Sequence, residues 1–306
     1  MSSFGECNEH LIGIFMKEVV RRALMEIRRQ RVLYEARQKP GYDGGEDIVT
    51  SADLAAQAIY LKSIRECFPT FGIVAEEGGD SPPEPETPYY FTVDPLDGTK
   101  AFHRRQSHGV GTMLALVHQG ATNAVVAAYV GDVNTEEIYG YRPDSARLHR
   151  ISDFQTAETL SIPEGRPLNS QYALLRDPLY VYPDWVARVC GPVAVSGCFT
   201  GHEIEGGSIG IGMARLWKGE VGAYFLKPGM QTPWDLTPVV GISRHLGFVF
   251  LEANHTGTEF RRYAPNILPQ PYRTDRVTVV LHASRLPEWE RQSGGRVIPE
   301  QGMRIA

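Results

Sequence analysis

The stretch Val93-Asp94-Pro95-Leu96-Asp97-Gly98-Thr99 places two carboxylates three residues apart in a tight turn. Pro95 restricts the backbone between the two acids, and Gly98 lets a ligand approach the main chain closely. The apolar run at residues 89–93 is typical of a buried strand. Open α/β sheets commonly bind ligands at the carboxyl ends of their strands, so we expect both acids to line a binding site there. Taken alone, Asp-Pro and Asp-Gly pairs also form ordinary turns.

The composition indicates a globular protein with a substantial core. The chain has 306 residues, of which 42% are hydrophobic, and its formal net charge is -5. This acidic balance argues against a protein whose main role is to coat a nucleic acid polymer or an anionic membrane. The chain shows no basic and apolar leader segment and no apolar run near the roughly 18 residues of a bilayer span. We therefore expect a cytoplasmic protein.

The cysteines carry no metal-binding signature, because neither a CxxC pair nor another ligand spacing is present. The four cysteines are Cys7, Cys67, Cys190 and Cys198. We expect reduced thiols, and the sequence leaves open a pairing of Cys190 with Cys198. No cluster of histidines and cysteines competes with the acids for a softer metal.

Apolar periodicity predicts helices and an antiparallel meander in the first half. Apolar residues recur on one face of residues 11–36, which is typical of a surface helix that covers a core. A second helical pattern covers residues 55–68, and Thr50 and Asp53 before it form a capping-box pattern. Alternating segments after the opening motif predict a largely antiparallel meander. Its strands are expected at residues 110–117, 124–130, 137–141 and 148–151.

In the second half, strand-like and helix-like segments alternate, which favours an α/β layered sheet. Strands are expected at residues 172–175, 193–196, 221–225 and 248–251, and helices at 184–189, 208–217 and 235–245. The segment 163–167 is the best candidate boundary, so we expect an α/β metal-binding half at 1–165 and an α/β half at 166–306 that completes the site. The tail from about residue 286 is expected to be loosely held. No GxGxxG after a strand and no GxxxxGK is present, which argues against dinucleotide and P-loop sites.

Carboxylates stand at the ends of predicted elements in three separated places. They are Glu76, the pair Asp94 and Asp97, and Asp235. Ordinary structural explanations exist for each; Asp235, for example, suits a helix cap with Pro238 in the first turn. Spacing alone does not show that these side chains meet.

The order of four motifs resembles the inositol monophosphatase superfamily of Mg²⁺-dependent, lithium-sensitive phosphomonoesterases. The motifs are Asp47-Ile48-Val49-Thr50-x-x-Asp53, Glu76-Glu77, Asp94-Pro95-Leu96-Asp97-Gly98-Thr99 and Trp234-Asp235. They follow the order of that family with compatible spacings, and the resemblance extends over roughly residues 11–251. It implies a five-layer αβαβα sandwich and a phosphoric monoester hydrolase. Four motifs in order are specific for the superfamily but not for a substrate.

The resemblance implies a magnesium site with two to three ions. Glu76, Asp94 and the backbone carbonyl of Leu96 match the ligands of one ion. Asp94, Asp97 and Asp235 match the ligands of a second, and Glu76 lies near a third, weaker position. Hard oxygen ligands that leave room for water are what Mg²⁺ prefers, and Mn²⁺ suits the same ligands.

The resemblance also implies catalytic and phosphate-binding roles. Thr99 and Asp53 match the pair that orients and deprotonates the attacking water. The backbone N–H groups of Gly98 and Thr99 match the phosphate-binding positions, at the start of the helical turn that follows. Metal-bound water has a lowered pKa, so a modest base suffices. Asp53 retains its capping role under this interpretation.

Substrate identity depends on the second half, where the resemblance weakens. Inositol-preferring relatives carry an acid shortly before the WD motif, whereas this chain has Phe225-Leu226-Lys227. Ser208 and Lys227 are the candidate substrate residues. Lys227 either meets a second phosphate or carboxylate or is a solvated loop lysine. The segment Arg244-His245-Leu246-Gly247-Phe248 replaces the acid and paired glycines that many relatives carry after the WD helix.

Two basic features have open roles. Four residues follow the metal motif and form either a rim that would favour an anionic leaving group or a basic surface loop. They are His103, Arg104, Arg105 and His108. Lys39 is the nearest candidate for a lysine that relatives carry in the loop before Asp47.

We therefore expect a Mg²⁺-dependent phosphatase that hydrolyses a small phosphomonoester by attack of metal-activated water. An inositol-monophosphate-like substrate is the first candidate. The alternatives are a 3'(2'),5'-bisphosphate nucleotidase, a histidinol-phosphate phosphatase and a sugar bisphosphatase. A catalytically silent regulatory module that binds metal and phosphate is disfavoured because Asp53, Thr99 and the carboxylates are all retained. The family resemblance implies a homodimer, and we expect neither a nucleic acid polymer nor a membrane as partner.

Overall fold

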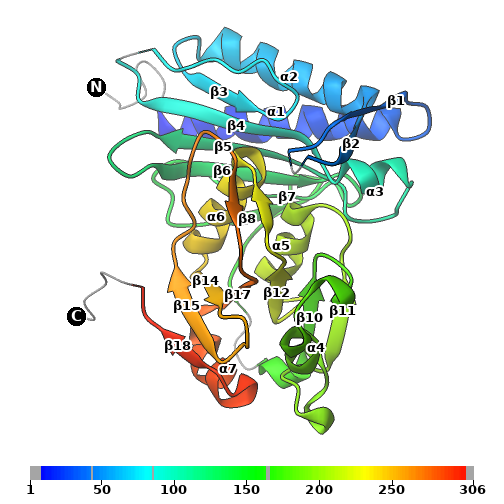
Figure 1. Ribbon diagram of the computed structural model, residues 1–306. Helices are drawn as coiled ribbons and strands as arrows, with labels where there is room; N and C mark the ends of the chain where they lie inside the picture. The colour runs from blue at the N-terminus through cyan, green and yellow to red at the C-terminus, as the bar shows by residue number, and fades with distance from the viewer. Residues whose placement is uncertain (1–7, 43, 85, 163–165, 301–306) are drawn as a thin grey trace.

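The computed structural model describes residues 8–42, 44–84, 86–162 and 166–300 of the chain. These residues form five layers, in which two helices, a sheet, two helices, a second sheet and two further helices follow one another (Figure 1). The prediction of a layered αβαβα sandwich is therefore confirmed.

The first sheet and the helices that cover it come from the first half of the chain. Helices α1 (Glu9–Gln30) and α2 (Ser51–Cys67) lie side by side on its outer face (Figure 1). The order is β3-β4-β5-β6-β7-β8-β9, with β3 and β4 parallel and the other neighbours antiparallel. Its strands are β3 (Gly72–Ala75), β4 (Tyr89–Asp97), β5 (Gly111–His118), β6 (Ala124–Asp132), β7 (Ile138–Tyr141), β8 (His149–Ile151) and β9 (Ala157–Thr159). The predicted antiparallel meander is thus present.

Two short features flank the strand that carries the opening motif. A hairpin of β1 (Ala36–Pro40) and β2 (Glu46–Thr50) leads into α2, and the short helix α3 (Thr99–His103) follows β4. Helix α3 contacts β2, so the hairpin lies close to the end of β4.

The first helix is shorter than its periodicity predicts. Asn8 caps its start by accepting a hydrogen bond from the Leu11 N–H at 2.9 Å, and the helix ends at Gln30 rather than at 36. Two apolar residues beyond this end, Val32 and Leu33, are 78% and 85% exposed. They pack against no core, so nothing holds them in the helix, and the chain turns into β1 instead.

The second sheet has seven strands in the order β11-β10-β12-β17-β14-β15-β18. Its strands are β10 (Tyr172–Leu175), β11 (Gly201–Ile204), β12 (Ala223–Leu226), β14 (Phe248–Ala253), β15 (Glu259–Tyr263), β17 (Thr278–His282) and β18 (Arg296–Ile298), and β13 (Gly229–Gln231) pairs separately with β16 (Tyr272–Thr274). Helices α5 (Ile209–Trp217) and α6 (Pro233–His245) lie between the sheets, and α4 (Asp184–Cys190) and α7 (Leu286–Ser293) cover the outer face (Figure 1). The alternation of strands and helices agrees with the sequence pattern.

Three apolar cores hold the five layers together. One lies between the first sheet and α1 and α2, and includes Tyr60 and Phe91. A second surrounds α5 and α6 between the two sheets and includes Trp217. The third lies beneath α4 and α7 and includes Phe225 and Trp289. The middle core therefore holds α5 and α6 against both sheets.

Two expectations for the second half are wrong. Residues 193–196 form no strand; Val193–Val195 is a 3-10 turn in which Val193 and Val195 are 51% and 66% exposed. β-branched side chains favoured a strand, but Pro192 begins a turn and Ser196 adopts a left-handed conformation. The tail is held in place over residues 286–298, because α7 buries Trp289 completely and β18 pairs with β15; residues 301–306 lie outside the described residues.

The cysteine and boundary expectations have different outcomes. Cys190 and Cys198 are both buried free thiols, so the open pairing does not form. Cys7 lies outside the described residues, as do residues 163–165 of the predicted boundary. The division at 165 and 166 therefore stays a prediction.

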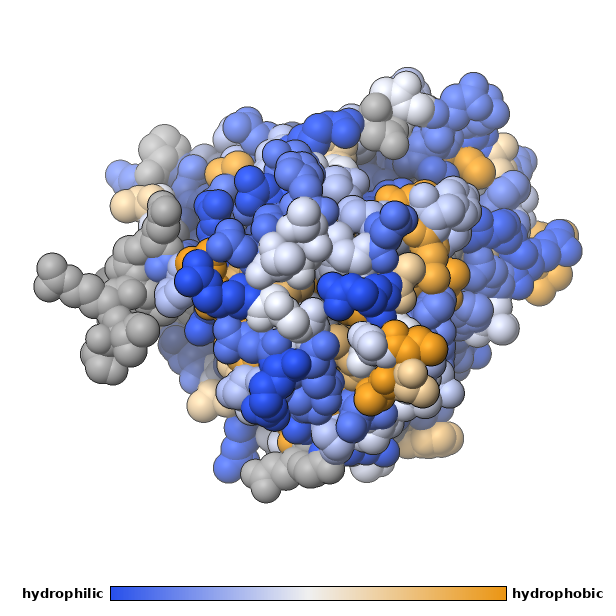
Figure 2. All heavy atoms as spheres, turned by 60° about the horizontal axis from the view of Figure 1, so that its bottom comes forward, coloured by the Kyte–Doolittle hydropathy of each residue, from blue (hydrophilic) through white to orange (hydrophobic). Residues whose placement is uncertain are grey.

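The surface shows no sign of a membrane-spanning element within the described residues. None of the described helices combines the length and apolar character that a bilayer crossing requires. Figure 2 brings the lower end of Figure 1 forward, and apolar patches of limited size lie there among hydrophilic residues. Scattered apolar side chains are normal on protein surfaces, so this face by itself does not indicate a binding partner.

A buried hydrogen bond between the two central helices should contribute measurably to stability. The Trp217 Nε1–H of α5 donates to the Ser243 hydroxyl of α6 at 2.9 Å, and both residues are fully buried. Ser243→Ala leaves the indole N–H without an acceptor, so we expect the free energy of unfolding to fall by about 1–3 kcal/mol in urea titrations. Adding Trp217→Phe to Ser243→Ala should cost less than the sum of the two single changes. Strict additivity would contradict the coupling.

Candidate metal and phosphate site

The end of β4 carries the two acids of the opening motif. All of β4 is buried, and its antiparallel register with β5 shifts between Asp94 and Asp97. In a regular strand, side chains three positions apart point to opposite faces. Pro95 cannot donate a ladder hydrogen bond, and the irregularity at this point reorients the strand so that both carboxylates reach one place.

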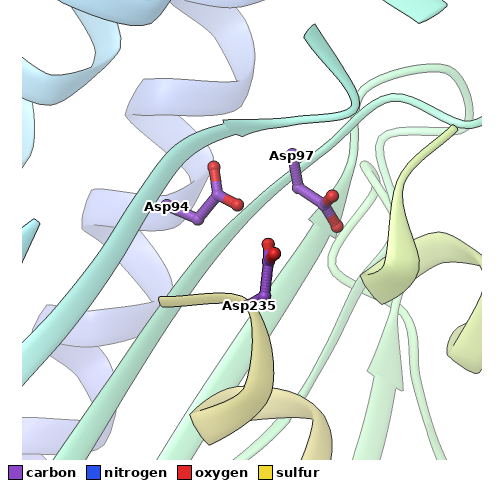
Figure 3. A group of neighbouring side chains, drawn as sticks. All are labelled: Asp94, Asp97 and Asp235. Carbon is purple, nitrogen blue, oxygen red and sulfur yellow. The ribbon is translucent and has the colours of Figure 1, made fainter. Parts of the chain in front are cut away.

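The third carboxylate comes from the beginning of α6. Pro233 occupies the first turn of this helix, and Asp235 lies in the same turn, where the helix dipole favours negative charge. Oxygen atoms of Asp94, Asp97 and Asp235 all lie within 4.8 Å of one another, and Figure 3 shows Asp235 reaching from α6 toward the part of β4 that carries Asp94 and Asp97. Residues 141 positions apart in the sequence are thus brought together.

The three carboxylates are poorly compensated within the protein. Asp94 is 1% exposed, and its Oδ1 has no hydrogen-bond partner among the described residues. Burial raises the pKa of Asp94 well above its ordinary value, and the negative charges of Glu76, Asp97 and Asp235 raise it further. Like charges this close ionise together only when a cation offsets them.

Asp97 is oriented by the N-terminus of α5. Its carboxylate accepts hydrogen bonds from the Ser208 hydroxyl, the Ile209 N–H at 3.2 Å and the Gly210 N–H at 2.7 Å. Burial and the charge of Asp235 nevertheless raise the pKa of Asp97 to about 6. The hydrogen bonds tie β4 of the first sheet to α5.

Gly98 is required by the backbone that follows Asp97. Its φ of +90° lies in the left-handed region, and a Cβ there would be 2.3 Å from the carbonyl oxygen of Gly109 and 2.8 Å from the backbone nitrogen of Ser208. A side chain at this position would therefore push apart β4 and the loop before α5.

Thr99 and Asp53 form a buried pair beside the carboxylates. The Thr99 hydroxyl lies 2.9 Å from Asp53 Oδ1 and 3.0 Å from the carbonyl oxygen of Leu96, and it donates to one of them at a time. Asp53 Oδ2 accepts from the N–H of Thr50 at 2.8 Å and from its hydroxyl, which completes the predicted capping box. Burial outweighs these hydrogen bonds and raises the pKa of Asp53 to about 6.

Glu76 stands slightly apart from the three aspartates. It follows β3 and forms an ion pair with Lys39 of β1 at 3.0 Å, and Lys39 also pairs with Glu77. Burial raises the pKa of Glu76 to about 8, although Lys39 opposes the shift. The charges of Glu76 and Asp94 nonetheless act on one another, which places Glu76 at the edge of the same site.

The candidate substrate residues have other contacts in the structure. Ser208 is fully buried; its hydroxyl donates to Asp97 and accepts from the Ile211 N–H at 2.9 Å, so it caps α5. Lys227 forms an ion pair with Asp177 at 2.9 Å, and its side chain is 44% exposed. Substrate contacts by Ser208 and Lys227 stay predictions.

The four basic residues after the metal motif are exposed, and one of them reaches the second half. Arg104 donates to the carbonyl oxygen of Gly206 at 2.9 Å, in the loop before α5. His103 lies against Tyr34, with 3.3 Å between its Nδ1 and the tyrosine oxygen. The exposed positions are His103, Arg104, Arg105 and His108. These positions suit the interpretation of a basic surface loop beside the site.

Sequence reasoning missed Arg176, which directly follows β10. The charges of Asp235 and Asp97 both act on its guanidinium. A cation at the carboxyl end of a predicted strand was the available signal, but nothing in the spacing related residue 176 to the DPxDG motif.

The donors present fit hard divalent cations. The cluster offers carboxylate oxygens only, one of them is buried without a hydrogen-bond partner, and the backbone between Asp94 and Asp97 is irregular. Oxygen donors of this kind suit Mg²⁺, Mn²⁺ or Ca²⁺ rather than zinc.

The fold and the site define a layered α/β protein in which carboxylates from the end of β4 and the start of α6 meet. The family model described as the inositol monophosphatase family matches residues 12–282, and the chain belongs to that family. This membership confirms the resemblance drawn from the four sequence motifs.

Curated relatives match over shorter segments. Nus factor SuhB of Escherichia coli K12 is 35% identical over 92 residues, which are 30% of this chain and 32% of that protein. The 3'(2'),5'-bisphosphate nucleotidase CysQ of Salmonella typhimurium LT2 is 40% identical over 77 residues, which are 24% of this chain and 29% of that protein. The matched segments thus span about a third of these relatives.

Solved structures share the fold over nearly the whole chain. The extragenic suppressor protein suhB of Bartonella henselae superposes with a TM-score of 0.68 at 16% identity, covering 96% of this chain and 100% of that one. An IMPase of Thermotoga maritima gives 0.66 at 18% identity, covering 92% and 95%. A structure described as IMPase/NADP phosphatase complexed with Mg²⁺ and phosphate gives 0.64 at 16% identity, covering 90% and 92%.

The raised pKa values predict that a divalent cation stabilises the protein most at alkaline pH. In the folded protein the pKa values of Asp53 and Asp97 are about 6 and that of Glu76 is about 8, against about 4 in unfolded chains. Raised values mean that the folded state binds more protons, so in EDTA the free energy of unfolding should fall as the pH rises from about 4 to 8. Saturating Mg²⁺ should restore more stability at about pH 8 than at about pH 5.5.

Denaturant titrations at both pH values, with and without Mg²⁺, measure this difference. Asp94→Asn should reduce both the pH dependence in EDTA and the stabilisation by Mg²⁺. Equal stabilisation by Mg²⁺ at the two pH values would contradict the assignment of the cation to these carboxylates.

Proposed function

We propose that this protein is a Mg²⁺-dependent phosphatase that hydrolyses a small phosphomonoester. The observation that carries the proposal is the convergence of Asp94, Asp97 and Asp235 within 4.8 Å, next to the hydrogen-bonded pair of Thr99 and Asp53. Membership of the inositol monophosphatase family supports phosphatase chemistry. The names IMPase/NADP phosphatase and bisphosphate nucleotidase among the similar proteins support the same class.

The carboxylates would hold the cations. Asp94, Asp97 and Asp235, with Glu76 and the carbonyl of Leu96, are the proposed ligands of two to three Mg²⁺ ions, and Mn²⁺ suits the same oxygens. Bound Mg²⁺ supplies charge neutralisation and lowers the pKa of a coordinated water. The hydrogen bonds from α5 keep the Asp97 carboxylate in one orientation.

Thr99 and Asp53 are the proposed groups that move a proton. The Thr99 hydroxyl donates to Asp53, so its oxygen is left free to accept a hydrogen bond from an attacking water. Asp53 is fully buried and has a pKa of about 6, which lets it accept a proton near neutral pH. Its contacts with Thr50 prevent the carboxylate from turning away.

The phosphoryl group is proposed to lie against the backbone N–H groups of Gly98 and Thr99. The left-handed Gly98 begins α3, so the first N–H groups of this turn have no partner within the helix. Phosphoryl transfer depends mainly on in-line positioning and charge neutralisation, and this arrangement offers both.

Residues of the second half of the chain are proposed to determine which substrate is bound. An inositol-monophosphate-like compound is the first candidate, and a bisphosphate nucleotidase, a histidinol-phosphate phosphatase and a sugar bisphosphatase are the alternatives. We also propose a homodimer, as the family resemblance implies, and a cytoplasmic location, as expected from the sequence. The alternative is a regulatory module without catalysis, and the name Nus factor of the SuhB relatives is the observation in its favour. The three aspartates of the cluster and the Thr99–Asp53 pair favour an enzyme instead.

Substitution of the proposed groups should separate cation binding from proton transfer. Phosphate release from a panel of phosphomonoesters should require Mg²⁺. Thr99→Ala and Asp53→Asn should each lower kcat by about 10²- to 10⁴-fold, the usual contribution of a positioned acid or base. Asp94→Asn should weaken the apparent Mg²⁺ affinity by more than the roughly 10- to 100-fold typical of residues that only support a ligand.

The matched control is Asp144→Asn, which removes an exposed carboxylate in a turn of the first half. This variant should hydrolyse the panel at the wild-type rate. Absence of Mg²⁺-dependent hydrolysis of every phosphomonoester by the wild-type protein would favour the regulatory module.

Lithium should inhibit the phosphatase, as the family resemblance implies. A small monovalent cation that replaces a weakly held Mg²⁺ leaves part of the phosphate charge without compensation. Phosphate release should therefore fall in millimolar lithium at low Mg²⁺ and recover as Mg²⁺ is raised. Undiminished activity in lithium would argue against the third cation position near Glu76.

A further inference from the structure

Arg176 occupies the carboxyl edge of three parallel strands. β10 pairs in parallel with both β11 and β12, and Arg176 is the residue that follows it. Its N–H donates to the carbonyl oxygen of Phe225 at 3.2 Å, and its own carbonyl accepts from the Gly206 N–H at 3.2 Å. Carboxyl edges of parallel strands are where layered α/β proteins commonly bind ligands.

Strand alternation directs the Arg176 side chain toward the middle layer. Ala173 and Leu175 belong to the outer core beneath α4 and α7, whereas Leu174 belongs to the core around α5 and α6. Side chains two positions apart share a face, so Arg176 continues the face of Leu174. The beginnings of α5 and α6 on that side carry Ser208 and Asp235.

The Arg176 guanidinium has no carboxylate partner in the described part of the chain. The side chain forms neither an ion pair nor a hydrogen bond there, although the residue is half-buried. Neighbouring cations differ: Lys227 pairs with Asp177, and Arg215 pairs with three glutamates that include Glu205. An arginine withdrawn from water without a partner is unfavourable unless a ligand supplies one.

Polar atoms around Arg176 are likewise unsatisfied. Tyr224 Oη, Glu205 Oε1 and Asp177 Oδ2 are buried and have no hydrogen-bond partner among the described residues. The charges of Arg176 and Glu205 both act on Tyr224, which places these groups around one space. Buried polar atoms are normally hydrogen-bonded, so a group of unpartnered ones beside a candidate active site indicates that a ligand or water fills the space.

The charge balance of Arg176 depends on whether the aspartates hold cations. Burial alone would lower the pKa of Arg176, but the negative charges of Asp235, Asp97 and Asp177 raise it. Divalent cations bound to Asp235 and Asp97 would offset those negative charges. Of these acids, Asp177 alone would then still offset the guanidinium, and it already pairs with Lys227, so an anion from outside would be favoured beside Arg176.

We propose that Arg176 binds a second anionic group of the substrate, separate from the phosphoryl group that is hydrolysed. The proposal rests on the phosphatase function proposed above and narrows it to bisphosphates or phosphorylated acids. The planar guanidinium donates two parallel hydrogen bonds to the oxygens of a phosphate or a carboxylate. Arg176, rather than the exposed and already paired Lys227, thus determines specificity for the part of the substrate that leaves.

Pairs of substrates that share the scissile phosphate test this role. The pairs are adenosine 3',5'-bisphosphate with adenosine 3'-monophosphate, fructose 1,6-bisphosphate with fructose 1-phosphate, and 3-phosphoglycerate with glycerol 3-phosphate. The wild type should show a higher kcat/KM for the member with the second anion in at least one pair. The third pair separates preference for a carboxylate from preference for a phosphate.

Arg176→Gln should lower kcat/KM for the preferred member by roughly 10- to 100-fold, the usual effect of losing charge-assisted hydrogen bonds, and far less for its partner. Arg176→Lys should retain part of the preference. Arg261→Gln is the matched control, because Arg261 is exposed on β15, on the far side of the same sheet. This control should leave both members of each pair unchanged.

Binding measured without turnover separates this proposal from the proposed function. Calorimetry with the Asp53→Asn variant in Mg²⁺ should show tighter binding of the compound with two anions, and adding Arg176→Gln should remove the difference. That result would support the role of Arg176 even if the wild type hydrolysed no compound. Equal losses for both members of every pair, or loss of discrimination in Lys227→Gln instead of Arg176→Gln, would overturn it.

Discussion

The repulsion among buried carboxylates is the constraint on which the rest of this structure depends. Asp94 and Asp97 are 1% and 3% exposed, and an oxygen of Asp235 lies within 4.8 Å of both. Burial is the first cause of the raised pKa values of Asp94 and Asp97, and the negative charges of their neighbours raise both further. Packing of the surrounding layers keeps the acids together, and a cation bound between them would offset the repulsion.

The site is built where elements from both halves of the chain meet. Asp97 accepts two backbone hydrogen bonds at the start of α5, and Gly98 leaves room for the Ser208 backbone. Trp217 and Ser243 join α5 to α6, which carries Asp235. The positions of Asp97 and Asp235 therefore depend on the packing of the middle core, because α5 and α6 lie in that core between the two sheets.

The basic side chains on the two sides of the acidic cluster differ in their partners. Lys39 is bound to Glu76 and Glu77 on the side of the first sheet, whereas Arg176 lacks a partner among the described residues on the side of the second. The first arrangement holds a proposed ligand in place, and the second leaves a donor for a molecule from outside. Similar structures at 16–18% identity show that the five-layer fold persists while most side chains change.

Local sequence determined much of this protein. Periodicity predicted most helices and strands, and the capping-box pattern of Thr50 and Asp53 indicated the start of α2. The four motifs identified the family. Local sequence misled where apolar residues lacked a core, as at Val32, Leu33 and residues 193–196. Only the tertiary structure decided that Asp235 meets Asp94, that Ser208 is engaged with Asp97, and that Arg176 faces the same site. These contacts depend on how the layers pack against one another. The number of residues between two positions in the sequence does not indicate how far apart packing places them in space.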